Sequence, residues 1–230
     1  MAKDRCQCTP DCKRPPLEGK AFCADHIKFC PRISPLSGSE LPYNPDKFNK
    51  HQGIKDSNNC YAYALGYTDL PKKCTEDDCN ASFPQPGRAS GYPQWNKVYG
   101  KKCEDILART MGDIPGIEPA DFKDKCPPKT RKIALVTDPY NDYHWYRQDN
   151  NGWWSHKPGA TDVSNKDTSG RPIYDPQLAM RKSKDSRLNY KNFCGYLCLP
   201  LPEKVKRRRK HITYRIRRKG GTHKKRKSSK

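Results

Sequence analysis

IALVTDPYNDYHWYRQDNNGWWSH, residues 133–156, is the stretch that decides the fold of this chain. It holds three runs rich in β-branched and aromatic residues, which are typical of strands: Ile133–Val136, Tyr143–Gln148 and Trp153–His156. The turn signals Asp138-Pro139 and Asn151-Gly152 separate these runs. The pattern therefore predicts consecutive antiparallel strands joined by short turns.

The second turn predicts which histidines meet. Asp149-Asn150-Asn151-Gly152 suits a type I turn with Gly in the left-handed position of a bulge, which makes a three-residue loop. In that register Tyr146 faces His156, and His144 lies diagonally from His156 on the same face, about 7–8 Å away at the backbone. We expect the two imidazoles to meet. A loop of two or four residues would place them on opposite faces.

Helical signals precede the strands. Cys60–Gly66 (CYAYALG) follows three residues that favour a helix N-cap, Ser57, Asn58 and Asn59. A second helix is expected around Lys102–Met111, after a loop-like stretch at 69–95 that contains four prolines. A last strand is expected at Phe193–Leu199. Helices followed by an antiparallel sheet predict an α+β domain.

Cys60 stands where a helix is expected to begin. A helix N-terminus stabilises a thiolate, and a nearby imidazole would complete an activated nucleophile. The string Asn59–Ala64, followed by strands that carry His144 and His156, resembles the papain-like cysteine peptidases and amidases of the NlpC type. The resemblance covers roughly residues 50–200 and implies a papain-like core. It also implies roles for three residues: nucleophile Cys60, general base His144 and orienting residue His156.

This chain departs from that family in two respects. No upstream side chain for an oxyanion hole can be identified beyond Asp56 or Asn59, and the Pro-rich insertion is long. In the alternative reading, Cys60 packs inside its helix and His144 is a strand histidine with its hydrogen bonds satisfied.

Residues 1–32 form a short Cys/His-rich module with few apolar residues. Because burial alone would not fold it, we expect a structural zinc ion held by four ligands. The spacing favours Cys8, Cys12, Cys23 and His26, with Cys6 and Cys30 as alternates. Disulfides or free thiols are the alternative.

The cysteine count, 12, bears on the compartment. With no apolar signal core and no long apolar run, the sequence predicts a protein made in the cytosol, not exported by a signal peptide and without a membrane span. Cytosolic cysteines favour metal binding or catalysis over disulfides, although an oxidising particle would permit disulfides. Cys194 and Cys198 are expected to share a strand face, where Cys103 and Cys126 could join them in a core or a second metal site.

Two thirds of the net positive charge lies at the C-terminal end of the chain. A Pro-rich connector, 33–49, leads to the central domain, 50–202, and a polybasic arm, 203–230, follows. The formal net charge is +21; the arm has 15 Lys and Arg against one acid, a net +14. Such a block stays extended until a polyanion neutralises it. The residues expected to bind it are Lys206, Arg207, Arg208, Arg209, Lys210, Arg215, Arg217, Arg218, Lys219, Lys224, Lys225, Arg226 and Lys227.

Two functions fit these features. In the first, which we favour, the protein is a structural or packaging component of a larger assembly, such as a minor capsid protein. Its papain-like domain is then a scaffold, and its arm binds nucleic acid or acidic neighbouring subunits. Cys/His-rich starts and Lys/Arg-rich ends resemble proteins of large DNA viruses, which implies the nucleus or the virion as location. The alternative is an active cysteine hydrolase that uses Cys60 and His144.

Overall fold

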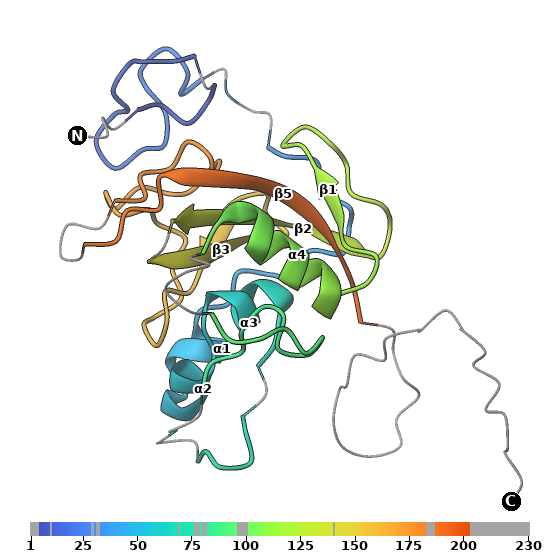
Figure 1. Ribbon diagram of the computed structural model, residues 1–230. Helices are drawn as coiled ribbons and strands as arrows, with labels where there is room; N and C mark the ends of the chain where they lie inside the picture. Colours follow the sequence, from blue (N-terminus) through green and yellow to red (C-terminus); the bar gives the residue numbers. More distant parts are fainter. Residues whose placement is uncertain are drawn as a thin grey trace, which may run out of the picture.

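A computed structural model of the chain describes residues 5–9, 11–28, 30, 33–68, 70–75, 79, 82–95, 101–139, 141–182 and 187–202. This part contains the helices α1 (Asp46–Asn49), α2 (Gln52–Ser57), α3 (Cys60–Leu65) and α4 (Cys103–Asp113). Its strands are β1 (Glu118–Ala120), β2 (Thr130–Asp138), β3 (Asp142–Gln148), β4 (Trp154–His156) and β5 (Asn192–Pro200). Figure 1 shows the helices on one side of the sheet. The α+β class is confirmed.

The five strands form one antiparallel sheet in the order β1-β5-β2-β3-β4. The strands β2, β3 and β4 follow one another as the sequence predicts. The last strand, β5, does not join their outer edge; it pairs with β2 on the side away from β3 and separates it from the short strand β1. The sheet is therefore completed by the pairing of strands that are far apart in the sequence.

The hairpin between β3 and β4 has the predicted register. The Asp149 amide donates to the Trp153 carbonyl (2.8 Å), and the Gly152 amide donates to the Asp149 carbonyl (2.9 Å). Gly152 has a φ of 84°, the left-handed conformation that the bulge requires. Tyr146 is paired with His156 across the strands. The prediction of a three-residue loop is confirmed.

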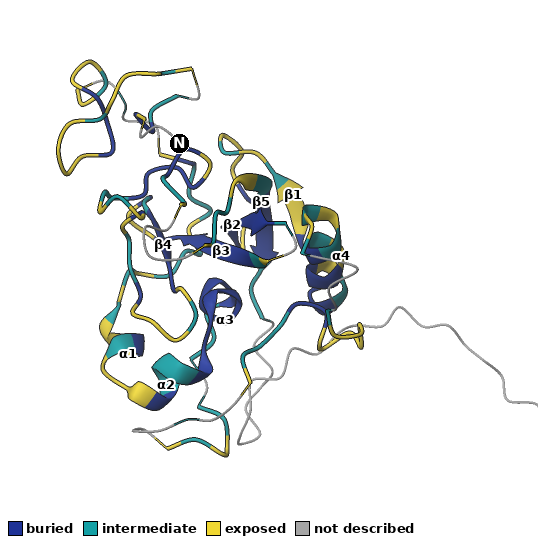
Figure 2. Ribbon diagram, turned by 60° about the vertical axis from the view of Figure 1, so that its left-hand side comes forward, coloured by how far each residue is buried: buried dark blue, intermediate teal, exposed yellow. Residues whose placement is uncertain are grey.

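α3 and α4 cover one face of the sheet. α3 begins as predicted, because the Asn59 side chain caps it by accepting from the Ala62 amide at 3.1 Å. Its apolar side chains join those of α4 and the strands in a single buried cluster, which includes Tyr61, Leu65, Ile106, Leu135, Trp145 and Leu197. Figure 2 shows α3 and the central strands as the most deeply buried part of the fold.

The described segments that cover the opposite face of the sheet contain none of the four helices. Long irregular segments after β4 bring Ile173 and Ala179 onto Tyr146, Trp154 and Tyr196. The N-terminal module lies beyond this layer, on the side of the sheet away from the helices (Figure 1). Residues 5–9, 11–28, 157–182 and 187–191 are mostly turns and coil with some buried side chains, and hydrophobic periodicity does not predict such structure.

The N-terminal module and the connector both pack on the central domain. Gln7 is 1 % exposed; its side chain donates to the Pro172 carbonyl (3.2 Å) and accepts from the Tyr174 amide (2.8 Å). Ser34 accepts from the buried ammonium of Lys132 at 2.7 Å. Specific hydrogen bonds from Gln7 and Ser34 thus anchor both segments to the central domain.

Four disulfides staple the structure: Cys8–Cys30, Cys74–Cys79, Cys103–Cys194 and Cys126–Cys198. The expectation that the cysteines favour metal or catalysis over disulfides is therefore wrong for eight of the twelve. The other four, Cys6, Cys12, Cys23 and Cys60, are free. Two of the bridges tie β5 to distant parts of the chain.

Cys194 and Cys198 do not share a face, because β5 contains an irregularity. The register against β2 shifts between Leu135 and Val136, where Gly195 has a φ of 124°. The extra residue turns Cys194 toward the helix-side cluster, where it reaches Cys103, while Cys198 lies on the face of Tyr196. A common metal site for these cysteines is excluded.

The polybasic arm, 203–230, and all its predicted polyanion-binding residues lie outside the described residues. Within the described part of the chain, no helix is both long and apolar enough to cross a membrane.

Candidate metal centre and buried histidine pair

Four potential metal ligands meet in the N-terminal module: Cys6, Cys12, Cys23 and His26. Their ligand atoms all lie within 4.8 Å of one another. The Sγ atoms of Cys12 and Cys23 are 3.8 Å apart, and His26 Nδ1 lies 3.3 Å from Cys6 Sγ and 3.5 Å from Cys23 Sγ. Ligands of one tetrahedral ion with bonds of about 2.0–2.3 Å have separations of about 3.3–3.8 Å. The cluster could therefore hold a metal ion.

Local turns place these ligands. The amides of His26 and Ile27 both donate to the Cys23 carbonyl, at 3.1 and 3.0 Å, which sets Cys23 and His26 on one helical turn. The Cys6 amide donates to the Arg14 carbonyl at 3.1 Å. This bond holds the segment that contains Cys6 beside the segment that contains Arg14. Burial raises the pKa of the Cys6 thiol to about 11. A bound cation would offset that cost by favouring the thiolate.

The predicted ligand set needs one correction. Cys8 is not available as a ligand, because it is bonded to Cys30, whose Cα lies 5.6 Å from its own. Cys6, one of the two alternates, takes its place, and Cys30 is excluded for the same reason. Cys12, Cys23 and His26 do lie in the cluster.

The Cys/His cluster is joined to the core through aromatic packing. Phe22, next to the ligand Cys23, lies 4.8 Å from the Tyr174 ring in an edge contact and 6.1 Å from the Trp153 ring. Cys6 and Cys23 belong to the same buried cluster. The Cys/His cluster is thus packed against the layer that covers the sheet.

His144 and His156 meet as the hairpin predicts. His144 Nε2 lies 2.7 Å from His156 Nδ1, and His156 Nε2 lies 3.0 Å from the Lys166 carbonyl oxygen. Because a carbonyl only accepts, His156 Nε2 carries the proton, and His156 Nδ1 accepts from His144 Nε2. Burial lowers the pKa of His156 to about 4 and that of His144 well below its usual value. Both rings are therefore neutral at pH 7.

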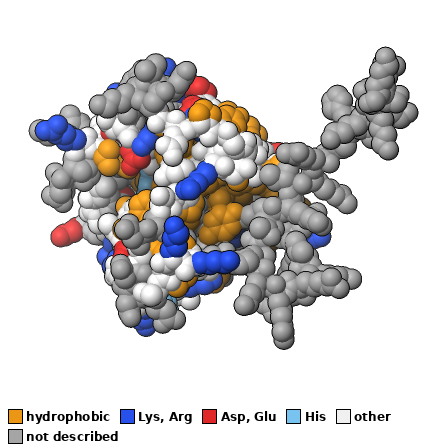
Figure 3. All heavy atoms as spheres, turned by 60° about the horizontal axis from the view of Figure 1, so that its bottom comes forward, with side chains coloured by type: hydrophobic (Ala, Val, Ile, Leu, Met, Phe, Trp, Pro, Cys, Tyr) orange, Lys and Arg blue, Asp and Glu red, His pale blue; other side chains and the backbone are white. Residues whose placement is uncertain are grey.

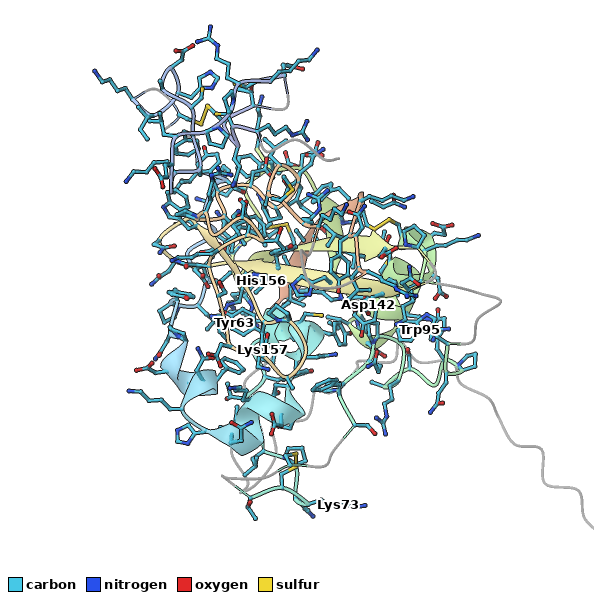
Figure 4. All side chains as sticks on the ribbon, turned by 90° about the vertical axis from the view of Figure 1, so that its left-hand side faces the viewer. Tyr63, Lys73, Trp95, Asp142, His156 and Lys157 are labelled. Atoms are coloured by element: carbon cyan, nitrogen blue, oxygen red, sulfur yellow. A yellow bond between two sulfur atoms is a disulfide. The ribbon has the colours of Figure 1, made fainter. Side chains whose placement is uncertain are left out.

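Cys60 is not part of this pair. Along β3 the side chains alternate: Tyr143 and Trp145 face α3, whereas His144 and Tyr146 face the other side. The Cys60 thiol, on α3, instead lies 3.9 Å from the Tyr143 carbonyl. Figure 4 shows His156 at the sheet, above Tyr63 of α3. The structure brings the two histidines together, but it does not bring Cys60 to either.

The residues considered for an oxyanion hole are also engaged. The side-chain oxygen of Asn59 caps α3, and the side-chain nitrogen, Nδ2, donates to the Pro84 carbonyl at 2.9 Å. Asp56 accepts from Gln52 on its own helix. Neither side chain presents a free donor beside Cys60.

Iodoacetamide is expected to modify Cys60 slowly in the native protein between pH 7 and pH 9. The side chain is 5 % exposed, and burial raises its pKa to about 12, so the reactive thiolate is scarce over this range. Site-resolved mass spectrometry measures the rate, and the urea-unfolded chain, in which a thiol has a pKa of about 8.5, is the control. Fast modification of the native protein at pH 7 would contradict this placement.

Comparison with known proteins adds a relative. The chain is 38 % identical over 156 residues to "Insoluble matrix shell protein 1" of Ruditapes philippinarum, and the match covers 67 % of this chain and 87 % of that protein. No family model matches the chain, and no solved structure matches it.

Proposed function

This chain belongs to the same family as insoluble matrix shell protein 1, and from that premise we propose that it is a structural protein of an extracellular matrix. The observation that carries the proposal is 38 % identity over a match that spans 87 % of the relative. The relative supports the structural half of our expectation. It gives no support to a capsid or packaging role, or to nucleic acid as a partner.

The cysteine pairing supports a location outside the cell. Disulfides persist in oxidising compartments and are rare in the cytosol. Four of them join segments 5 to 91 residues apart in sequence, so the fold is stapled both locally and globally. Under this proposal the protein acts in an oxidising matrix rather than in the cytosol, nucleus or virion that the sequence predicts.

The ion that we propose for the N-terminal cluster is zinc. Three thiolates and one imidazole are a set that zinc binds in structural sites, and the separations between the ligand atoms support tetrahedral coordination. The module has few apolar side chains of its own, so binding of the ion would supply much of its folding energy. Its role would be structural.

Cys6→Ser is expected to abolish zinc binding, whereas the double change Cys8→Ser and Cys30→Ser should leave one zinc ion bound. The first change removes a ligand, and the second removes only a disulfide. Elemental analysis of the purified proteins gives the zinc content, and hydrogen exchange of residues 5–28 reports the loss of order. Zinc retained by Cys6→Ser and lost from the double variant would restore Cys8 as the ligand.

We also propose that the central domain is a papain-like scaffold without hydrolase chemistry. A capped helix that begins at Cys60 and packs against the antiparallel strand β3 supports the likeness in architecture. The separation of Cys60 from His144 by the sheet argues against its use in catalysis.

For the polybasic arm, 203–230, we propose acidic macromolecules of the matrix as partners. Its net charge of +14 would bind any polyanion by releasing counterions. Deletion of 203–230 is expected to remove most of the salt-sensitive binding to a polyanion such as polyglutamate. With several contacts, affinity of the full chain should fall by about 10³-fold or more between 50 and 200 mM salt. Undiminished binding by the truncated chain would contradict this role.

The experiment that tests the proposed function is fractionation of the extracellular matrix of the organism that encodes the chain. Mass spectrometry would compare peptides of this protein in the washed insoluble residue, in the soluble extract and in the cell fraction. We expect them concentrated in the insoluble residue. Their confinement to the cell fraction would refute the proposal.

A further inference from the structure

A groove between the 82–95 loop and α4 is not used by any feature described above. It has a volume of ≈ 440 Å³ and is lined by aromatic, amide and basic side chains, among them Arg88, Tyr92, Trp95, Lys101 and Arg109. No carboxylate is among its described lining residues. Figure 3, which brings the lower side of Figure 1 forward, shows a hydrophobic patch with Lys and Arg side chains along one side of it.

The loop that forms one wall is held in a fixed shape. The Asp113 carboxylate, from the end of α4, accepts from the Gly87 amide at 2.7 Å and from the Ser90 amide at 2.8 Å. Gly87 has a φ of 86°, which favours glycine. The Tyr143 hydroxyl donates to the Gln85 side chain at 2.6 Å. A wall that is already ordered loses little entropy when a ligand binds.

Arg109 forms the floor of the groove. Its side chain is 5 % exposed, and its guanidinium carbon lies 4.5 Å from the Trp95 ring centre and 5.2 Å from the Tyr92 ring centre. Nε donates to Asp105 at 2.9 Å and Nη1 to the Pro93 carbonyl at 2.6 Å. Nη2 has no hydrogen-bond partner among the described residues. A buried guanidinium with a spare donor is a site for an anionic oxygen.

The remaining groups decide which kind of anion fits. Arg88 is exposed at the rim, and Tyr92 leaves 40 % of its surface uncovered beside it. Trp95, labelled in Figure 4, is turned inward by its hydrogen bond to Asp105 and lies 5.5 Å from the Tyr143 ring. A flat aromatic wall with amide side chains suits a sugar ring, whose C–H face packs on aromatics and whose hydroxyls bind amides.

We propose that this groove binds an acidic polysaccharide, with a carboxylate or sulfate on the guanidinium groups of Arg88 and Arg109 and a sugar ring against Tyr92. An acidic peptide would satisfy the charges as well. An acidic peptide of Asp and Glu has no ring, however, to pack against the aromatic wall. The inference is independent of the matrix role, because it rests on the groove alone.

Titration calorimetry of the full chain with a galacturonic acid hexamer tests the proposal, with maltohexaose as the neutral sugar and hexaglutamate as the acidic peptide. The titrations are done in 200 mM salt, where binding by the polybasic arm is about 10³-fold weaker than in 50 mM salt. Arg88→Gln is expected to weaken binding of the acidic sugar about tenfold. Tyr92→Ala should weaken it about fivefold. The matched control is Lys123→Gln, which removes an exposed positive charge outside the groove and should change the affinity less than twofold.

Each possible outcome of the titration either supports the proposal or overturns it. Tighter binding of the acidic sugar than of hexaglutamate, with loss in both groove variants, supports the proposal. Equal binding of hexaglutamate with the same sensitivity to Arg88→Gln would make the site a peptide site and overturn it. Binding that is unchanged in both groove variants would assign all polyanion affinity to the arm, and it would overturn the groove while leaving the matrix role intact.

Discussion

Replacing Cys103 and Cys194 together by alanine is expected to lower the free energy of unfolding by about 4–5 kcal/mol. This disulfide ties α4 to β5 across a sequence separation of 91 residues, the longest of the four. A cross-link over so long a loop removes more conformations from the unfolded chain than a short one does. Because Cys194 packs against the helix-side core, alanine at that position also leaves less apolar contact there.

The matched control is the double change of Cys74 and Cys79 to alanine, a pair only 5 residues apart, for which the same relation gives about 2 kcal/mol. Urea unfolding under non-reducing conditions, followed by tryptophan fluorescence, measures the free energy of unfolding of each variant. Equal losses in the two variants would contradict the assignment of Cys103–Cys194 as the principal staple between helix and sheet.

Asp149→Asn is expected to lower the free energy of unfolding by about 3–5 kcal/mol. Its carboxylate lies 3.0 Å from Arg147 Nε, and the two side chains are 1 % and 4 % exposed. The Arg147 guanidinium also lies 4.0 Å from the centre of the Tyr63 ring and donates to the Pro42 carbonyl. Removing the acid leaves a buried charge uncompensated. Asparagine still suits the first position of the turn, so the change isolates the charge.

The control for this prediction is Asp162→Asn, which breaks the pair between Lys55 and Asp162 at 2.9 Å. Asp162 is 63 % exposed, so the loss should stay below about 1 kcal/mol. A double variant, Arg147→Met with Asp149→Leu, should be less destabilised than Asp149→Asn, because no charge remains buried. A loss from Asp149→Asn as small as that from Asp162→Asn would show that the pair is open to water.

Sequence predicted best those parts that local chemistry fixes. The turn at Asp149–Gly152 set the register of β3 and β4 and therefore the meeting of His144 and His156. The cap at Asn59 set the start of α3. In both cases a few neighbouring residues decide the geometry, so no knowledge of distant contacts is needed.

Long-range pairing was beyond such reasoning. The insertion of β5 between β1 and β2, and the partners of eight cysteines, depend on contacts across the whole chain. Spacing alone leaves many disulfide connectivities open. The choice of Cys6 over Cys8 as ligand follows from one of these bonds.

The separation of Cys60 from the histidine pair has a similar cause. Alternation along β3 shows that His144 and Trp145 face opposite sides, but the sequence does not say which side α3 covers. In the structure α3 lies on the side of Trp145, so Cys60 packs in the core on that side. The histidine pair lies on the opposite face of the sheet. A bulge at Gly195 likewise moved Cys194 to the opposite face from Cys198.

The central claim is that this is an extracellular structural protein stapled by disulfides, and the thiol state of the natural protein tests it most directly. Tissue would be lysed in the presence of an alkylating agent, and the peptides would then be mapped by mass spectrometry without reduction. The account predicts four disulfides, Cys8–Cys30, Cys74–Cys79, Cys103–Cys194 and Cys126–Cys198, with Cys6, Cys12, Cys23 and Cys60 unpaired. A protein with all twelve cysteines alkylated would be a reduced, intracellular one, and it would contradict the account.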